Sequence, residues 1–301
     1  MPDNEDRERE LAKREVIPRT LAHMDHDSFD HIYQLVQEQL WLERRSRSLS
    51  ALWNSCNNDE EKKLVTSLIR RFQYLYGHLL EDAYLRAVNH VVNNWELQPN
   101  ETLFVAITGD ASPDGSQAVI QGMKSRIPAE TGWREELFLT RISDLKKKRK
   151  LAEKTIVLVE DFLGTGNKFF RQLAAVSELL KERGVDEPKV RLITVAAMEQ
   201  CKALLDAEGV IYYCDKWLKR GISDYEKDAD IAAAIANMRA LESRLKSPTN
   251  RRKYVPHLGY RKSESLVYFE AISIPNNVFP IFWWPTDSNN NNRTPMFPRI
   301  P

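Results

Sequence analysis

Two kinds of residue stand close together between positions 155 and 173 and could act on one ligand. Two acids, Glu160 and Asp161, follow an apolar run, and a glycine-containing stretch, 164–168, comes soon after them. Carboxylates bind hydroxyl groups, whereas bare N–H groups at the start of a helix bind a phosphate. The spacing therefore indicates a ligand with a phosphate at one end and hydroxyls at the other, such as a ribose 5-phosphate. A plain strand-loop-helix turn with a solvated acid pair is the competing interpretation.

A second turn could hold another anionic group. Gly109 and Asp110 follow the apolar run at 103–108, and Gly115 and Ser116 open the helical stretch behind them. Backbone N–H groups at that helix start would face a diphosphate. The turn contains two acids and no base, although diphosphate usually binds Lys or Arg. An ordinary Asp/Gly/Pro turn therefore stays an open interpretation.

The elements that position these turns alternate along the chain. Apolar runs typical of strands lie at 103–108, 136–140, 154–159, 190–197, 210–214 and 265–274. Helical spacing of apolar residues lies at 114–126, 167–183, 199–208 and 226–246. This alternation predicts an α/β fold with a parallel sheet and helices on both faces. Ligands bind at the carboxyl ends of the strands in such sheets, so the acid pair should face the crevice.

Changes in composition and in the pattern of apolar residues indicate how the chain is organised into regions. We predict a helical N-terminal region over 1–98, the α/β domain over 99–284 and a low-complexity tail over 285–301. An apolar stripe predicts one long helix over about 59–95, a surface for core packing or self-association. The tail, with four consecutive Asn residues and several prolines, is expected to be disordered or to dock on a partner as an extended arm.

Composition narrows the classes of protein. The chain has 301 residues, a formal net charge of +1, 11 glycines and three cysteines, which are far apart. Near-neutral charge argues against a nucleic-acid coat protein, and the odd, scattered cysteines argue against a disulfide framework. A charged start and short apolar runs predict neither a secretion signal nor a membrane span. A cytoplasmic protein is expected.

The acid and glycine segment resembles the phosphoribosyl-diphosphate (PRPP) motif of type I phosphoribosyltransferases, in which four apolar residues, two acids, two apolar residues and a Thr-Gly loop follow one another. The resemblance implies that the acids, as the candidate catalytic pair, bind the ribose 2′- and 3′-hydroxyls and that the following residues bind the ligand and its 5-phosphate. The residues implied are Glu160 and Asp161, then Phe162, Leu163, Gly164, Thr165, Gly166, Asn167 and Lys168. By position, Gly109, Asp110, Gly115 and Ser116 resemble the diphosphate loop of that family.

Three positions depart from that motif. Phe162 replaces a smaller aliphatic residue, Gly164 a small hydroxyl or aliphatic residue, and Lys168 a small residue. With the segment SIPNNVFPIFWW at 273–284, they make residues 100–284 more similar to a divergent phosphoribosyltransferase-like group of bacterial anti-phage systems, some of which accompany retrons.

Two functions follow from the resemblance. The first is an enzyme that binds PRPP or a nucleotide and transfers or cleaves at the anomeric carbon, with Mg²⁺ carried by the ligand and no metal ligand set on the protein. The second is an inactive nucleotide-sensing or assembly module of a defence complex. Its partners would be a reverse transcriptase, an ATPase or nucleic acid, and a homo-oligomer is possible in both cases. A purely structural interaction role is the third alternative.

Three other features have competing interpretations. The basic run Lys146–Lys150 suggests either a solvated loop or a nucleic-acid surface, and it should lie at the end of the sheet opposite the ligand. Residues 23–31, rich in His and Asp, resemble a metal site in composition but also a helix start. Asn276, Asn277 and the pair Trp283-Trp284 could close over a base, or pack a core edge.

Overall fold

The computed structural model describes residues 26–108, 114–128, 131–246, 255–270, 272 and 274–299. The chain divides into two compact units, residues 1–43 and 44–301. The first unit contains helix α2 (His26–Glu38), on which Phe29 and Tyr33 stack with ring centroids 6.2 Å apart. No helix within the described ranges is both long and apolar enough to cross a membrane.

A five-stranded parallel sheet forms the centre of the second unit. Its strands are β2 (Thr102–Ala106), β3 (Phe138–Leu139), β4 (Thr155–Leu163), β5 (Lys189–Met198) and β6 (Ile211–Leu218). They lie in the order β3-β2-β4-β5-β6, and every neighbouring pair is parallel. All five residues of β2 are buried, as continuous apolar runs in a sheet covered on both faces predict. The predicted α/β class is confirmed.

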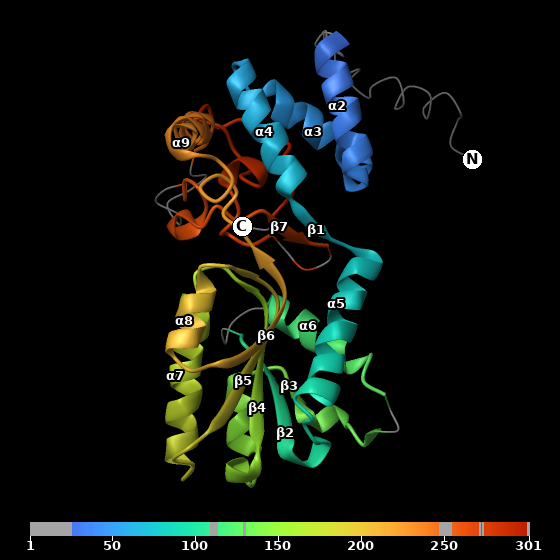
Figure 1. The fold of residues 1–301 in the computed structure, drawn as a ribbon, viewed down its shortest axis with the longest axis vertical. Helices are drawn as coiled ribbons and strands as arrows, with labels where there is room; N and C mark the ends of the chain where they lie inside the picture. The colour runs from blue at the N-terminus through green and yellow to red at the C-terminus, as the bar shows by residue number, and fades with distance from the viewer. Residues whose placement is uncertain are drawn as a thin grey trace, which may run out of the picture. The chain divides into compact units, whose positions relative to one another are not determined.

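Helices cover both faces of this sheet. Figure 1 shows α7 (Asn167–Glu182) and α8 (Cys201–Ala207) on one side, with α5 (Gly77–Asn89) and α6 (Gly115–Lys124) on the other. The connection after β2 leads outward to β3, whereas those after β4 and β5 lead the opposite way to β5 and β6. Strand order therefore reverses between β2 and β4, and a crevice opens beyond their carboxyl ends at such a point.

A smaller region of the same unit joins distant parts of the sequence. It contains α3 (Ser46–Asn54), α4 (Asp59–Arg71), α9 (Asp228–Ser243) and a two-stranded parallel sheet of β1 (Gln73–Leu75) and β7 (Val267–Phe269). The side chain of Asn58 caps α4 by accepting from the N–H of Glu61. Short helical turns connect the larger elements: η1 (Leu40–Arg45), η2 (His90–Asn94), η3 (Pro99–Glu101), η5 (Glu135–Leu137), η6 (Ile142–Lys147), η7 (Leu151–Glu153), η8 (Tyr260–Lys262) and η9 (Pro280–Phe282).

The prediction of one helix over 59–95 is wrong. The stripe is divided between α4 and α5, and strand β1 lies between them. Gln73, Tyr74 and Leu75 pair with Val267–Phe269, a contact that helical periodicity cannot anticipate. Gly77 then starts α5 with a φ of +43°, a backbone angle that favours glycine. Both helices still bury their apolar stripes, so periodicity located the buried faces but missed the break.

The low-complexity tail packs on its own chain, so the expectation of disorder is wrong for residues 285–299. Phe297 is fully buried and stacks on Tyr268, with ring centroids 4.4 Å apart. Its N–H donates to the carbonyl of Phe282 at 3.0 Å. The Arg293 guanidinium donates to the carbonyls of Trp284 and Ile281. The proposed domain boundaries at 98 and 284 stay predictions.

Candidate functional site

A cavity of about 980 Å³ opens at the carboxyl end of β4, where the strand order reverses. Its walls come from the β4–α7 turn, the start of α6, the end of β3 and the C-terminal segment (residues 255–279). The charged residues that line it are Asp114, Arg141, Glu160, Asp161, Lys168, Arg171 and Arg299. The cavity therefore has acids beside several bases, a pattern suited to a ligand with both hydroxyls and phosphates.

The acid pair lies within β4 and not after it. The strand continues to Leu163, and Glu160 pairs in register with Thr194 of β5. The expected loop residues Phe162 and Leu163 are therefore buried strand residues that still line the cavity. Sheet pairing with β5 extends β4 beyond the point at which the acids suggest an end. The acids consequently rest on a rigid strand.

The two acids have different environments. Glu160 is 3% exposed, whereas Asp161 is half-buried and faces the cavity. Burial, reinforced by the adjacent Asp161 carboxylate, raises the pKa of Glu160 well above its usual range. Burial also raises the pKa of Asp161. The Oε2 atom of Glu160 is buried without a hydrogen-bond partner. A carboxylate oxygen that is buried without a hydrogen bond or a counter-charge destabilises the folded protein.

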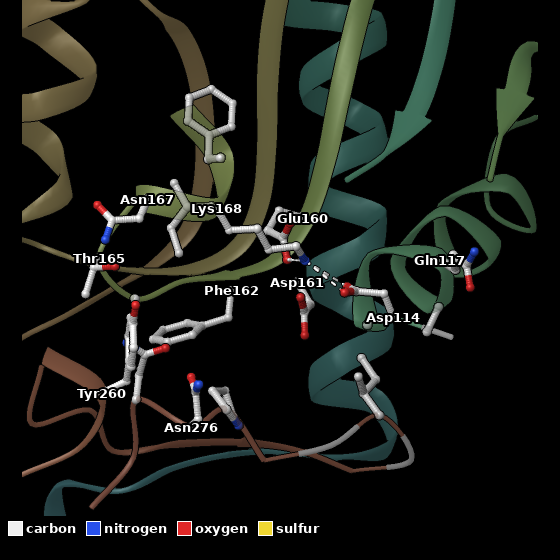
Figure 2. Close-up of a pocket in the computed structure, with 18 of the residues that line it drawn as sticks. Asp114, Gln117, Glu160, Asp161, Phe162, Thr165, Asn167, Lys168, Tyr260 and Asn276 are labelled. Carbon is white, nitrogen blue, oxygen red and sulfur yellow. Dashed lines mark hydrogen bonds and ion pairs between the residues drawn. The ribbon is translucent and has the colours of Figure 1, made fainter. Parts of the chain in front are cut away.

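Lys168 joins the acid pair to the start of α6. Its Nζ lies 2.9 Å from Glu160 Oε1 and 2.9 and 3.0 Å from the two carboxylate oxygens of Asp114 (Figure 2). Burial would lower the pKa of Lys168, but the two carboxylates outweigh it and leave this pKa above its usual range. In this structure the Lys168 ammonium contacts acids, and the contact with the 5-phosphate that the resemblance implies stays a prediction.

The turn after β4 leads directly into α7 and lines the cavity. Gly166 precedes α7 with a φ of +75°, and the side chains of Thr165 and Asn167 lie along the cavity (Figure 2). The carbonyl of Gly164 accepts from Gln200 Nε2 at 3.3 Å and from Cys201 Sγ at 3.5 Å. With that carbonyl held by α8, the N–H groups at the start of α7 can face an anion.

The C-terminal segment forms the facing wall. A Cβ on Gly164 would overlap the carboxamide of Asn277, so the turn and this wall are in close contact. Asn277 Nδ2 donates to Ser263 Oγ at 3.1 Å. With its amide oriented to satisfy both groups, Asn167 accepts from Arg261 at 2.7 Å. The wall therefore supports the β4–α7 turn from outside.

The proposed hood residues separate in the structure. Asn276 and Asn277 line the cavity together with Tyr260 (Figure 2). Trp283 and Trp284 are only 2% and 1% exposed and do not line it. The two Trp residues pack the core, which was the alternative interpretation.

The proposed diphosphate turn is only partly described. Gly109 and Asp110 lie outside the described residues. A Cβ on Gly115 would overlap the carboxylate of Asp161, so the start of α6 packs directly on the acid pair. Ser116 is buried and its Oγ donates to the carbonyl of Ile107 at 3.1 Å, so this hydroxyl has a structural partner. The assignment of these residues to a ligand stays a prediction.

Several cavity residues escaped the sequence prediction. Asp114 caps α6, and its carboxylate meets Lys168 across the crevice. Arg141 follows β3, and Arg171 lies one turn beyond Lys168 on α7. Position after a predicted strand was a usable signal for Arg141, because carboxyl strand ends converge. Nothing in the sequence identified Arg299, which approaches from the tail.

Neither of the other two charged segments contributes a described residue that lines the cavity. Lys146–Lys150 precedes β4, at the end of the sheet opposite the cavity, as expected. Lys147 and Lys150 pair with Asp144 and Glu153. Of the His-rich stretch, residues 23–25 lie outside the described residues, and His26 contacts Asp30 at 3.5 Å. A nucleic-acid role for the basic run stays a prediction.

Comparison with known proteins places these features in context. The PRTase-CE family model matches residues 53–299. Hypoxanthine-guanine phosphoribosyltransferase from Schistosoma mansoni in complex with IMP is 11% identical, with 49% of this chain and 69% of that chain covered and a TM-score of 0.32. The AQ2163 protein from Aquifex aeolicus is 14% identical, with 55% and 86% covered and a TM-score of 0.32. No curated protein matches the chain.

Proposed function

This chain belongs to the PRTase-CE family, and on that premise we propose that its cavity binds PRPP or a nucleotide with the same ribose 5-phosphate end. The family confirms the coarser expectation of a phosphoribosyltransferase-like domain. One observation carries the finer proposal. A pair of acids, of which Glu160 is buried with one unpartnered oxygen, shares one cavity with a glycine turn at a helix start, at the point where strand order reverses.

Different residues of the cavity would bind different parts of the ligand. The acids Glu160 and Asp161 would accept hydrogen bonds from the ribose hydroxyls. The turn from Gly164 to Asn167, with the N-terminus of α7 behind it, would hold the 5-phosphate. Arg141 and Arg171 bring positive charge to a cavity whose acids alone would repel phosphates. This arrangement supports a phosphorylated sugar over an uncharged one.

A divalent cation fits this proposal. Mg²⁺ carried by the diphosphate and the sugar hydroxyls would neutralise their charge, and the orphaned Glu160 oxygen beside Asp161 is a suitable neighbour. In transfer, the bond between the anomeric carbon and the diphosphate oxygen breaks, and the acceptor forms its bond to that carbon. Diphosphate leaves with the electron pair. The chain would stabilise developing charge through its fixed acids and bases.

An inactive module is the second candidate. The turn before α6 contains acids and no base, which disfavours productive binding of diphosphate. In this alternative the cavity senses a nucleotide and the domain assembles with partners. We propose an anti-phage defence setting for either function, with a reverse transcriptase, ATPase or nucleic acid as partner. This setting has its support in the resemblance of the 155–173 and 273–284 segments to the retron-associated group.

Calorimetric titration with PRPP and Mg²⁺ tests the ligand, and mass spectrometry for released diphosphate tests turnover. We expect one site per chain, and a loss of affinity of about 100-fold or more in Asp161→Asn, as removal of a charged hydrogen-bond acceptor predicts. Asp186→Asn, an exposed change before β5, is the matched control and should bind normally. Binding without diphosphate release favours the module. Equal affinity in the two variants would contradict the assignment of the site.

A further inference from the structure

We propose that Glu160 and Asp161 hold a divalent cation directly, before any ligand binds, and that Lys168 competes with it. This inference deepens the proposed ligand site and rests on that proposal for its function. In the proposed function the ligand carries the cation, whereas in this inference the protein itself would supply the oxygen ligands. Hence a cation should bind to the chain alone, without a ribose phosphate.

The first support is the arrangement of the carboxylates. Asp114, Glu160 and Asp161 each offer an oxygen atom, and these three atoms lie within 4.8 Å of one another. In the described part of the chain, this is the one group of three residues of metal-ligand type with that spacing. They come from separate elements, β4 and the start of α6, both fixed by the sheet. Clustered carboxylate oxygens are the ligands that Mg²⁺ and Mn²⁺ prefer.

The second support is an independent one, the unsatisfied oxygen of Glu160. The residue is 97% buried, and its Oε1 atom accepts from Lys168 while Oε2 has no partner. Most buried side-chain oxygens in proteins have a donor or a cation. Asp161 lies beside it, and both residues line the cavity (Figure 2). A cation bound between the two acids would give the unsatisfied oxygen a partner.

Charge counting gives the reason for binding. When all three carboxylates are ionised, as ligands of a cation must be, the one ammonium of Lys168 leaves two negative charges in a partly buried cluster. The glycine at position 115 lets the start of α6 approach Asp161, but a helix start alone does not neutralise two charges. A divalent cation supplies the two positive charges that are missing. Water reaches the cluster from the cavity and can complete the coordination of a hard ion.

Lys168 acts against that ion. Its ammonium occupies one oxygen of Glu160 and both oxygens of Asp114, the atoms that a cation would otherwise share. It also places a positive charge next to the proposed ion, and two like charges at this separation repel. The ammonium is attached to a flexible four-carbon stem in the first turn of α7, so it can withdraw. Lys168 should therefore weaken cation binding and set its affinity.

Titration with Mn²⁺ alone tests the proposal, with free Mn²⁺ followed by electron paramagnetic resonance. We expect one weak site in the wild type, binding tighter by about tenfold or more in Lys168→Met, and no site in Asp161→Asn. Lys181→Met, an exposed change of equal charge near the end of α7, is the matched control and should match the wild type. Lys168→Gln repeats the test if the Met variant unfolds in a thermal scan.

Two results would overturn the inference. One is the lack of Mn²⁺ binding by both the wild type and Lys168→Met. The other is binding by Lys168→Met that is no tighter than binding by Lys181→Met. Neither result affects a positive PRPP titration, so the proposed function can survive this failure. Conversely, Mn²⁺ binding with these affinities but no binding of any ribose phosphate would keep the cation site and overturn the proposed function.

Discussion

Two buried glutamates, each 3% exposed, differ in how their charge is satisfied. The carboxylate of Glu264 accepts from the N–H groups of Ile222 and Ser223 at 2.9 and 2.8 Å and from the Ser223 hydroxyl at 2.5 Å. Glu160 accepts from a single ammonium, has one orphaned oxygen and stands next to another acid. One site is complete within the chain, and the other is not.

The difference separates an acid that supports the fold from an acid with an unsatisfied oxygen that lines the cavity. Glu264 fixes the segment before β7, where Leu258, Arg261 and Glu264 itself all have positive φ values. Such backbone angles are unfavourable for these residues and need external support. Glu160 supports no comparable backbone, and its environment raises its own pKa. An acid kept under those conditions is more consistent with binding than with stability.

The largest expected effect compares these two residues directly. Glu264→Met should lower the free energy of unfolding by about 2–4 kcal/mol, because the buried N–H groups of Ile222 and Ser223 would lose their acceptor. Glu160→Met should change it by less than about 1 kcal/mol, because the loss of one ion pair is offset by relief of repulsion from Asp161. Urea unfolding followed by tryptophan fluorescence measures both. Equal losses would remove the distinction between the two sites.

An intermediate effect concerns the contact between the β4–α7 turn and the C-terminal segment. Gly164→Ala should lower the free energy of unfolding by about 1–2 kcal/mol, because its Cβ would overlap the Asn277 carboxamide. It should also weaken PRPP binding, since the phosphate turn must shift. The double variant Gly164→Ala/Asn277→Ser is the control and should recover part of the stability. Simple additivity of the two changes would show that the contact is not strained by the methyl group.

The smallest expected effect concerns a third buried acid, Glu61. Arg244 donates to both carboxylate oxygens of Glu61, at 3.1 and 2.7 Å. Burial would raise the pKa of Glu61, but Arg244 and the N–H of Asn57 outweigh it and leave this pKa below its usual range. Glu61 therefore stabilises the fold above its ordinary pKa of about 4.3, and this contribution is lost as pH falls through the folded-state value.

We therefore expect Glu61→Gln to be less stable than the wild type at pH 6 and the gap to shrink by about 1 kcal/mol at pH 3. Urea unfolding at the two pH values checks this. Glu60→Gln, whose partner Lys63 is exposed, is the control and should show almost no gap at either pH. A gap that widens in acid would mean that Glu61 resembles Glu160 more than Glu264.

Local patterns predicted most of the sheet and the centre of the site. The runs at 103–108, 154–159 and 190–197 correspond to β2, β4 and β5, because buried parallel strands are continuously apolar. The acid pair and the glycine turn fall in the cavity for the same reason, since the ends of such strands converge. In these segments the local sequence pattern and the tertiary contacts favour the same structure.

Features that depend on distant contacts could not be predicted. Lys168 meets Asp114 only because α6 and α7, on opposite faces of the sheet, both start at the carboxyl ends of the strands. Residues 73–75 become a strand only because 267–269 lies beside them, which helical periodicity cannot show. The tail is ordered because Phe297 finds Tyr268, although its Asn and Pro content is typical of disorder. The composition of these segments does not show which distant residues they pack against, and those contacts determine their structure.

The pairing of β1 with β7 has a consequence for the order of assembly during synthesis. The two strands are about 190 residues apart, so they can pair only after most of the chain has been synthesised. Asn277 and Tyr260, which form one wall of the cavity, belong to the same late segment. A nascent chain can therefore fold the five-stranded sheet and expose an open phosphate turn well before the cavity exists. Ligand competence would then be acquired only when translation has passed the residues of that wall.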